Sequence, residues 1–215
     1  MTIEITPPAF ESVDIESLTA EKVEPANIPG YDLWYIANGT PLSESLTRAL
    51  RVMHIRDFTL RALMPDSSHK FANTDEAASF TTGKMYKRDA YVLTAQADES
   101  LETNLAAFGW FRPIIDPRTE GNYEDYDLAA VLYDRNEDLN SHVTAAIEVF
   151  AGYRNKLATV DLIDTTLADY NNRHPELHGV CVRVGTPRAI NMVEHTQFDR
   201  LTTEEGGGGI FVRQL

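Results

Sequence analysis

The chain has 215 residues, a formal charge of −14 and 43% hydrophobic residues. A chain of this length can bury one core well. Such an acidic chain disfavours nucleic acid as a partner, because binding it depends on neutralising phosphates. No apolar run approaches the roughly 20 residues that a membrane span needs, so no membrane association is predicted. Acidity favours attraction of cationic small molecules or basic peptides, although acidic surfaces also serve solubility alone.

Cysteine content and the first residues indicate the compartment. Cys181 is the single cysteine of the sequence, which excludes an internal disulfide and is typical of a reducing compartment. The opening residues MTIEITPPAFESVDIE contain no basic region of the kind that starts a secretory signal. We therefore predict a cytoplasmic protein, in which Cys181 is buried on a core strand.

The first half of the chain predicts an arm, a strand, a helix and a pair of strands. Residues 1–30 are rich in Pro and Glu and predict an irregular acidic arm, followed by a single domain over residues 31–215. A strand is expected over residues 31–37. The next helix has Ser43 as a plausible N-cap and an apolar stripe of Leu42, Leu46, Leu50 (or Ala49) and Met53. Residues 90–95 and 105–111 predict neighbouring antiparallel strands, and residues 126–133 a further strand.

A strand, a basic turn and a helix follow one another in residues 143–170. The apolar strand breaks at Ala151-Gly152, and the turn Tyr153-Arg154-Asn155-Lys156 leads into a helix with apolar residues at helical spacing. The first N–H groups of a helix have no partner within it, and its dipole favours an anion there. This segment predicts a phosphate site; an ordinary basic turn, common in α/β proteins, is the alternative.

A second segment places another strand and helix near the end of the chain. Residues 178–184 alternate with the strand period of two, and Pro187 suits the first turn of the helix that follows. The four glycines at 206–209 predict a hairpin turn before a last strand over residues 210–212, and no helix follows them to make a phosphate loop.

Both segments resemble motifs of the GNAT superfamily of acetyl-CoA-dependent N-acyltransferases. In the first, Val149, Tyr153, Arg154 and Lys156 are in register with the family's coenzyme A turn, while Leu157 and Thr159 replace its glycines. In the second, Ala189 and Glu194 match the last-helix motif. Thr186, Val193 and Gln197 stand where the family usually has Asn, Tyr and Gly.

The resemblance implies a fold and a co-substrate. The fold is α/β (α+β), a mixed and mainly antiparallel sheet flanked by helices, splayed between the fourth strand, ending at Val149, and the fifth, over residues 180–184. The co-substrate is acetyl-CoA (coenzyme A), with no metal. The residues expected to bind it are Val149, Phe150, Arg154, Asn155, Lys156, Leu157, Ala158, Thr159, Thr186 and Ala189. Arg183 and Arg188 are expected to add positive charge.

The histidines do not predict a metal site. His174 and His178 have the four-residue spacing of paired helical ligands, but Pro175 and Gly179 disfavour a helix there. His142 is expected to be a plain residue at the start of a strand.

The implied activity is transfer of an acyl group, acetyl in the family, from acyl-CoA to an amine of a small molecule or peptide, with a cationic acceptor favoured. Glu148 is the candidate general base, acting through water. Strand alternation places it opposite Val149, and an exposed or paired carboxylate is an equally good interpretation. The family's general acid is a Tyr in the column of Val193. Its loss leaves a second hypothesis open, an inactive GNAT-fold protein that binds a ligand or partner. A homodimer is also left open.

Overall fold

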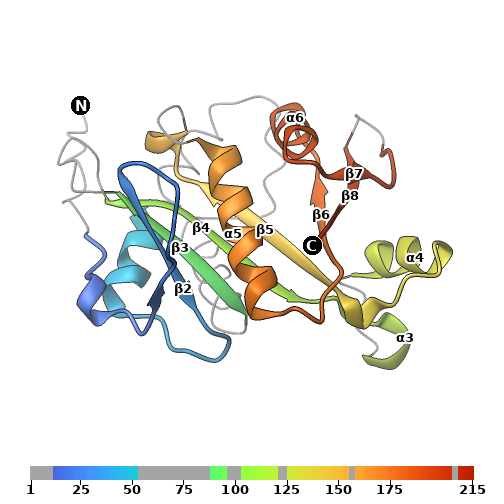
Figure 1. The fold of residues 1–215 in the computed structure, drawn as a ribbon, viewed down its shortest axis with the longest axis horizontal. Helices are drawn as coiled ribbons and strands as arrows, with labels where there is room; N and C mark the ends of the chain where they lie inside the picture. The colour runs from blue at the N-terminus through green and yellow to red at the C-terminus, as the bar shows by residue number, and fades with distance from the viewer. Residues whose placement is uncertain (1–11, 53–87, 96–102, 121–124, 155–157, 205–207) are drawn as a thin grey trace, which may run out of the picture. The chain divides into compact units, whose positions relative to one another are not determined.

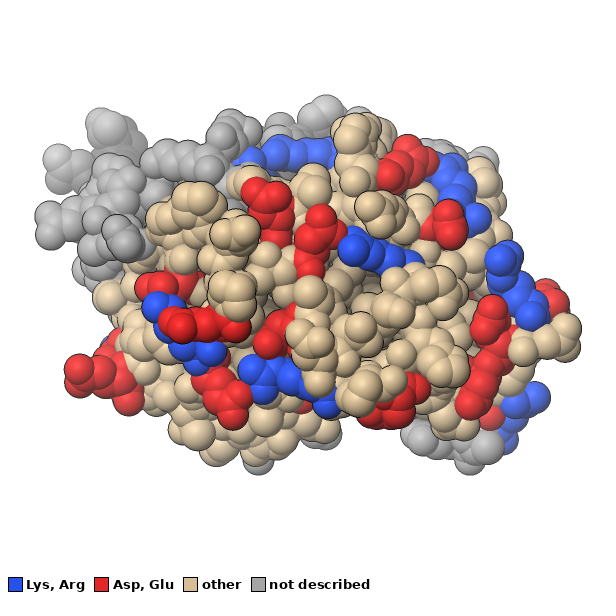
Figure 2. Space-filling model, in the orientation of Figure 1, with Lys and Arg blue, Asp and Glu red and all other residues tan. Residues whose placement is uncertain are grey.

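The structure is a computed structural model that describes residues 12–52, 88–95, 103–120, 125–154, 158–204 and 208–215. These residues fall into two compact units. The first lies within residues 1–108 and 148–157, and the second within residues 109–147 and 158–215. Figure 1 shows the elements along the chain, and Figure 2 shows acidic and basic side chains interspersed over the described surface of the same face.

Eight strands within the described residues follow the order β1-β2-β3-β4-β5-β6-β8-β7 in one sheet. The strands are β1 (Glu21–Lys22), β2 (Tyr31–Ile36), β3 (Asp89–Ala95), β4 (Leu105–Pro113), β5 (His142–Val149), β6 (Gly179–Val184), β7 (Asp199–Arg200) and β8 (Gly209–Gln214). Four of the strand pairs are antiparallel, whereas β5 and β6 are parallel. The predicted mixed, mainly antiparallel sheet is confirmed.

Helices connect these strands. They are α3 (Pro117–Glu120), α4 (Tyr126–Asp134), α5 (Thr159–Arg173) and α6 (Pro187–His195), with short 3-10 helices η1 (Ile15–Ser17), η2 (Leu139–Ser141) and η3 (Ala151–Tyr153). Residues 44–52 are also helical. Most predicted elements are found near their predicted positions. The predicted stripe residue Met53 lies outside the described residues.

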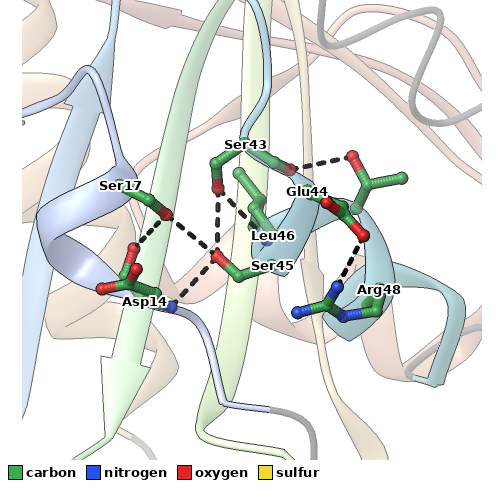
Figure 3. A network of polar contacts seen from close by, with 8 residues as sticks. Asp14, Ser17, Ser43, Glu44, Ser45, Leu46 and Arg48 are labelled. Atoms are coloured by element: carbon green, nitrogen blue, oxygen red, sulfur yellow. Dashed lines mark hydrogen bonds and ion pairs between the residues drawn. The ribbon is translucent and has the colours of Figure 1, made fainter.

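Serine hydroxyls fix the start of the helix of residues 44–52 in the first unit (Figure 3). Ser43 Oγ accepts a hydrogen bond from Leu46 N at 3.3 Å, so the predicted N-cap is confirmed. Ser45, which is buried, accepts from Asp14 N at 3.1 Å, and Ser17 Oγ lies 3.2 Å from Ser45 Oγ. The chain before residue 30 thus contacts this helix directly and contains η1 and β1. Its predicted boundary with a single domain at residues 31–215 stays a prediction.

Residues 126–133, predicted as a strand, form helix α4 instead. Leu128, Ala129 and Leu132 are its buried residues. Ala129 and Leu132 follow Leu128 by one and four residues, which places all three on one face of a helix. Asp125 precedes the helix without capping it, because its carboxylate holds the buried Arg112 guanidinium and accepts from Ile115 N at 2.8 Å. The strand prediction was therefore wrong.

Helix α4 covers one face of strands β6 and β8 in the second unit. Its buried residues form an apolar cluster with Cys181 of β6 and with Ile210 and Val212 of β8. Cys181 and Val212 are paired in the antiparallel register, so they point to the same face. The next register pair, Val182 with Phe211, points to the opposite face.

Strands β5 and β6 pair only at their beginnings. The register pairs are His142 with Gly179, Val143 with Val180 and Thr144 with Cys181. Beyond these three pairs, β5 continues to Val149 and β6 to Val184, with no further pair between them among the described residues. The predicted splay between these strands is confirmed.

A glycine permits this parallel pairing. A Cβ on Gly179 would lie 2.6 Å from His142 Cδ2 and 2.8 Å from His142 Nε2. His142 is held in place because it is 1% exposed and its Nδ1 lies 2.9 Å from the Asp138 carbonyl oxygen. His142, predicted to be a plain residue at the start of a strand, is thus a buried side chain at the end where β5 and β6 are paired.

Gly179→Ala should lower the free energy of unfolding by about 1–3 kcal/mol, the usual cost of overpacking a filled interior. Gly185→Ala is the matched control, because a Cβ there would meet nothing within 4 Å. Urea unfolding of both variants measures the difference. Equal stability of the two variants would contradict the close packing of His142 on Gly179.

Candidate functional site

The turn after β5 is anchored by buried aromatic residues in the first unit. Phe150 is fully buried, its N–H donates to Ala106 O at 2.8 Å, and its carbonyl accepts from Tyr153 N at 2.9 Å. Tyr153 is 2% exposed and donates its hydroxyl to Thr103 O at 2.8 Å. Both main-chain groups of Phe150 are engaged, so any contact it makes with a ligand would be shared with these bonds.

Arg154 closes this turn onto the end of the strand. Its Nε donates to Val149 O at 3.0 Å, and the side chain is half-buried. The guanidinium therefore lies beside the last residue of β5, at the position where the sequence predicts a charged contact with phosphate. Asn155, Lys156 and Leu157, also predicted to bind the coenzyme, lie outside the described residues.

The N-terminus of α5 has no side-chain cap. Ala158 occupies the N-cap position and has no oxygen to offer, and Thr159 begins the 15-residue helix. Capping would normally satisfy the first N–H groups, and within the part of the chain that the structure describes no capping side chain does so here. Asp161 lies exposed in the same first turn, where its carboxylate complements the helix dipole and would compete with a bound anion.

The start of α6 is capped, unlike that of α5. Thr186 Oγ1 accepts from Ala189 N at 3.3 Å, and Pro187 occupies the first turn as expected. Thr186 and Ala189, both predicted to bind the coenzyme, thus contact each other across this cap. Val193, in the column of the family's tyrosine, is 3% exposed and belongs to the core.

Glu148 lies near the end of β5 and is half-buried. Ala146, two residues earlier, is exposed, so the strand meets solvent in its second half, beyond the three residues that pair with β6. This placement is compatible with a base acting through water. The assignments of Glu148, Val149 and the other site residues stay predictions.

Arg183 does not supply uncommitted positive charge, contrary to expectation. Its guanidinium binds Asp127 of α4 at 3.0 Å and Glu204 at 2.8 Å. The hydrogen bond to Glu204 and the neighbouring carboxylates raise the pKa of Arg183. The group therefore joins α4 to the segment before β8. Arg188, on the exposed side of α6, stays a candidate.

Cys181 is excluded as a nucleophile. It is fully buried on β6, and burial raises the pKa of its thiol to about 12. The reactive thiolate is then absent near neutral pH, which agrees with the predicted core role.

The described residues contain no group of three or more His, Cys, Asp or Glu side chains placed to hold a metal ion. None of the helices among them is long and apolar enough to cross a membrane.

Several solved structures of similar fold are acetyltransferases. RimL, a ribosomal L7/L12 alpha-N-protein acetyltransferase, matches with a TM-score of 0.58 and 12% identity, over 94% of this chain and 99% of its own. AAC(6')-Ib in complex with ribostamycin and coenzyme A matches with 0.54 and 12%, over 86% and 93%. A GNAT-family acetyltransferase from Bacillus anthracis matches with 0.50 and 10%, over 85% and 93%.

No protein-family model matches the sequence, and neither does any curated protein. The structural matches at these identities establish the fold. The chain has the GNAT fold, as its two sequence motifs predict.

Proposed function

We propose that the protein transfers an acyl group, in the first instance acetyl, from acyl-CoA to an amine. One arrangement of the described residues carries the proposal, and it has two parts: β5 and β6 have three register pairs and no more, and the helix that connects them begins without a side-chain cap. The first feature leaves strand edges available to an extended ligand, and the second leaves helix N–H groups available to an anion. Coenzyme A combines an extended amide-containing arm with phosphates.

The solved structures of similar fold support this ligand class. RimL and AAC(6')-Ib have both been determined in complex with coenzyme A. Their names give a protein and an aminoglycoside as acceptors, which are compounds that carry amines. We infer an amine acceptor for this chain and, from its charge of −14, a cationic one. A cytoplasmic location and a homodimer stay predictions.

The proposed reaction needs little from side chains. The amine nitrogen attacks the thioester carbonyl, the new C–N bond forms, the C–S bond breaks, and the coenzyme leaves as a thiolate. Glu148 removes the amine proton through a water molecule. Because Val193 is buried where the family has Tyr, we assign no side chain to protonate the thiolate, and solvent supplies that proton. Positioning of the two reactants provides most of the rate.

Three departures from the family's motifs favour a second candidate function, which is binding without catalysis. Val193 belongs to the core, and Leu157 and Thr159 replace glycines that let phosphate approach the backbone. A protein of this kind would bind coenzyme A or another ligand and transfer nothing. Turnover with acetyl-CoA and a panel of amines separates the two functions, provided that coenzyme A binds.

Coenzyme A at millimolar concentration should raise the melting temperature of the protein, because a ligand that binds only the folded state stabilises it. Replacing Arg154 and Lys156 together by Glu should abolish that shift, since two cations beside the pyrophosphate become anions. Arg135→Glu/Arg118→Glu is the control, because it changes the net charge by the same amount on another part of the surface. An unmoved melting temperature of the unmodified protein would refute the proposed function.

Glu148→Gln should lower turnover by about 10²–10⁴, the usual contribution of a general base, and leave coenzyme A affinity unchanged. Glu44→Gln, an exposed carboxylate paired with Arg48, serves as the control. The measurement is a pH profile of the rate with a cationic amine, in which the Gln variant should lose the limb due to the base. Full activity of this variant at every pH would remove Glu148 from the mechanism, and a faster rate with anionic amines would refute the cationic acceptor.

A further inference from the structure

Arg213 of β8 joins two helices of the second unit. Its Nη1 donates to Asp164 Oδ1 in α5 and also to the carbonyl oxygen of Thr196, the residue that ends α6, at 2.8 Å. The Arg213 side chain is 20% exposed, so most of it is buried. One side chain thus fixes α5 and α6 to the same strand.

The position of Arg213 in the sheet relates these bonds to the splay. Its register partner is Val180, which also pairs with Val143 of β5, next to the last pair before the strands separate. Strand alternation places Arg213 opposite Val212, whose face is covered by α4. Arg213 therefore points to the face on which α5 and α6 lie, at the closed end of the splay.

The bond to α6 satisfies the end of that helix. Thr196 is 1% exposed, and its own hydroxyl donates to carbonyl oxygens of the last turn, Met192 O and Val193 O at 3.1 Å. Its carbonyl oxygen lies at the negative end of the helix dipole, where a cation is favourable. The guanidinium supplies the donor and the charge together.

The bond to α5 lies in the N-terminal half of that helix, whereas the bond to α6 lies at its C-terminus. Asp164 is only a few residues from Ala158, the N-cap without a capping side chain. A charged hydrogen bond at this point restrains the N-terminal half of α5 against β8. The C-terminal half has a different anchor, because Tyr170 stacks on Phe111 of β4 at a centroid distance of 4.1 Å.

We propose that Arg213 is a positioning residue of the coenzyme site. By holding Asp164 and the end of α6 at once, it sets the place of the first turn of α5 relative to the part of β6 that has no register partner in β5 among the described residues. Coenzyme A must contact both of these features in the proposed function, on which this inference rests. Loss of Arg213 then weakens coenzyme A binding more than it weakens the fold, since each helix keeps its own buried face.

Three substitutions test this role. Arg213→Gln removes both bonds, Asp164→Ala removes only the bond to α5, and Arg213→Lys keeps a charge and a donor. Arg173→Gln is the matched control, because it disrupts an Arg–Asp pair of 2.7 Å that lies within α5. Calorimetric titration with coenzyme A should show about fivefold or more weaker binding for Arg213→Gln and Asp164→Ala, as for coupled sites in general. Arg213→Lys should be intermediate, and Arg173→Gln should bind like the unmodified protein.

If Arg213→Gln binds coenzyme A as tightly as the unmodified protein does, the inference is overturned while the proposed function stays intact. The same holds if Arg173→Gln weakens coenzyme A binding as much as Arg213→Gln does. If Arg213→Gln fails to fold, Asp164→Ala decides the question in the same way. If even the unmodified protein does not bind coenzyme A, the proposed function fails. Amide hydrogen exchange without ligand then still tests whether Arg213 restrains the two helices. Asp164→Ala should then exchange faster in the first half of α5, and Arg213→Gln there and in the last turn of α6. Unchanged exchange in α5 would show that the bond between Arg213 and Asp164 does not restrain this helix.

Discussion

The limited pairing of β5 with β6 is the constraint on which the rest of the structure depends. Three register pairs hold the strands together, and the close approach of the His142 ring to Gly179 lies within the first of them. From Ala145 onward β5 has no register partner in β6 within the described residues, while β6 stays paired with β8 along its whole length. The backbone groups on the facing edges are thereby kept from becoming sheet partners of each other. In the proposed function, a ligand with amide groups pairs with them as a strand would.

The helices reinforce this constraint from both faces of β6 and β8. On one face, α4 packs on Cys181, Ile210 and Val212 through its buried stripe. On the other face, Arg213 binds α5 and the end of α6. The described part of the turn after β5 is held by side-chain hydrogen bonds. Tyr153 is bonded to Thr103 O, and Arg154 to Val149 O.

Much of this arrangement could be predicted from the sequence, because the strands and helices around the site have clear periodicity and caps. Ser43 was predicted to cap a helix and does so. The error at residues 126–133 has a physical cause: Leu128, Ala130 and Leu132 alternate as in a strand, while Leu128, Ala129 and Leu132 have helical spacing. The buried face decided between the two patterns, and it exists only once β6 and β8 are in place.

The side-chain contacts of the site could not be predicted in the same way. Arg183 was expected to help hold phosphate, but it binds Asp127 and Glu204, which are distant from it in sequence. Arg213 carries no local signal at all, because its partners belong to two other elements. Such contacts follow from the packing of α4, α5 and α6, which the order of elements alone does not specify.

The central claim is that the opening between β5 and β6, with the uncapped start of α5, binds coenzyme A. The most direct measurement is a titration of isotope-labelled protein with coenzyme A, followed by the amide chemical shifts. We expect the largest changes at residues 158–161 and along the unpaired parts of the strands, residues 145–149 and 182–184, with little change at residues 168–173. Changes confined to other residues, or none at millimolar coenzyme A, would contradict the claim.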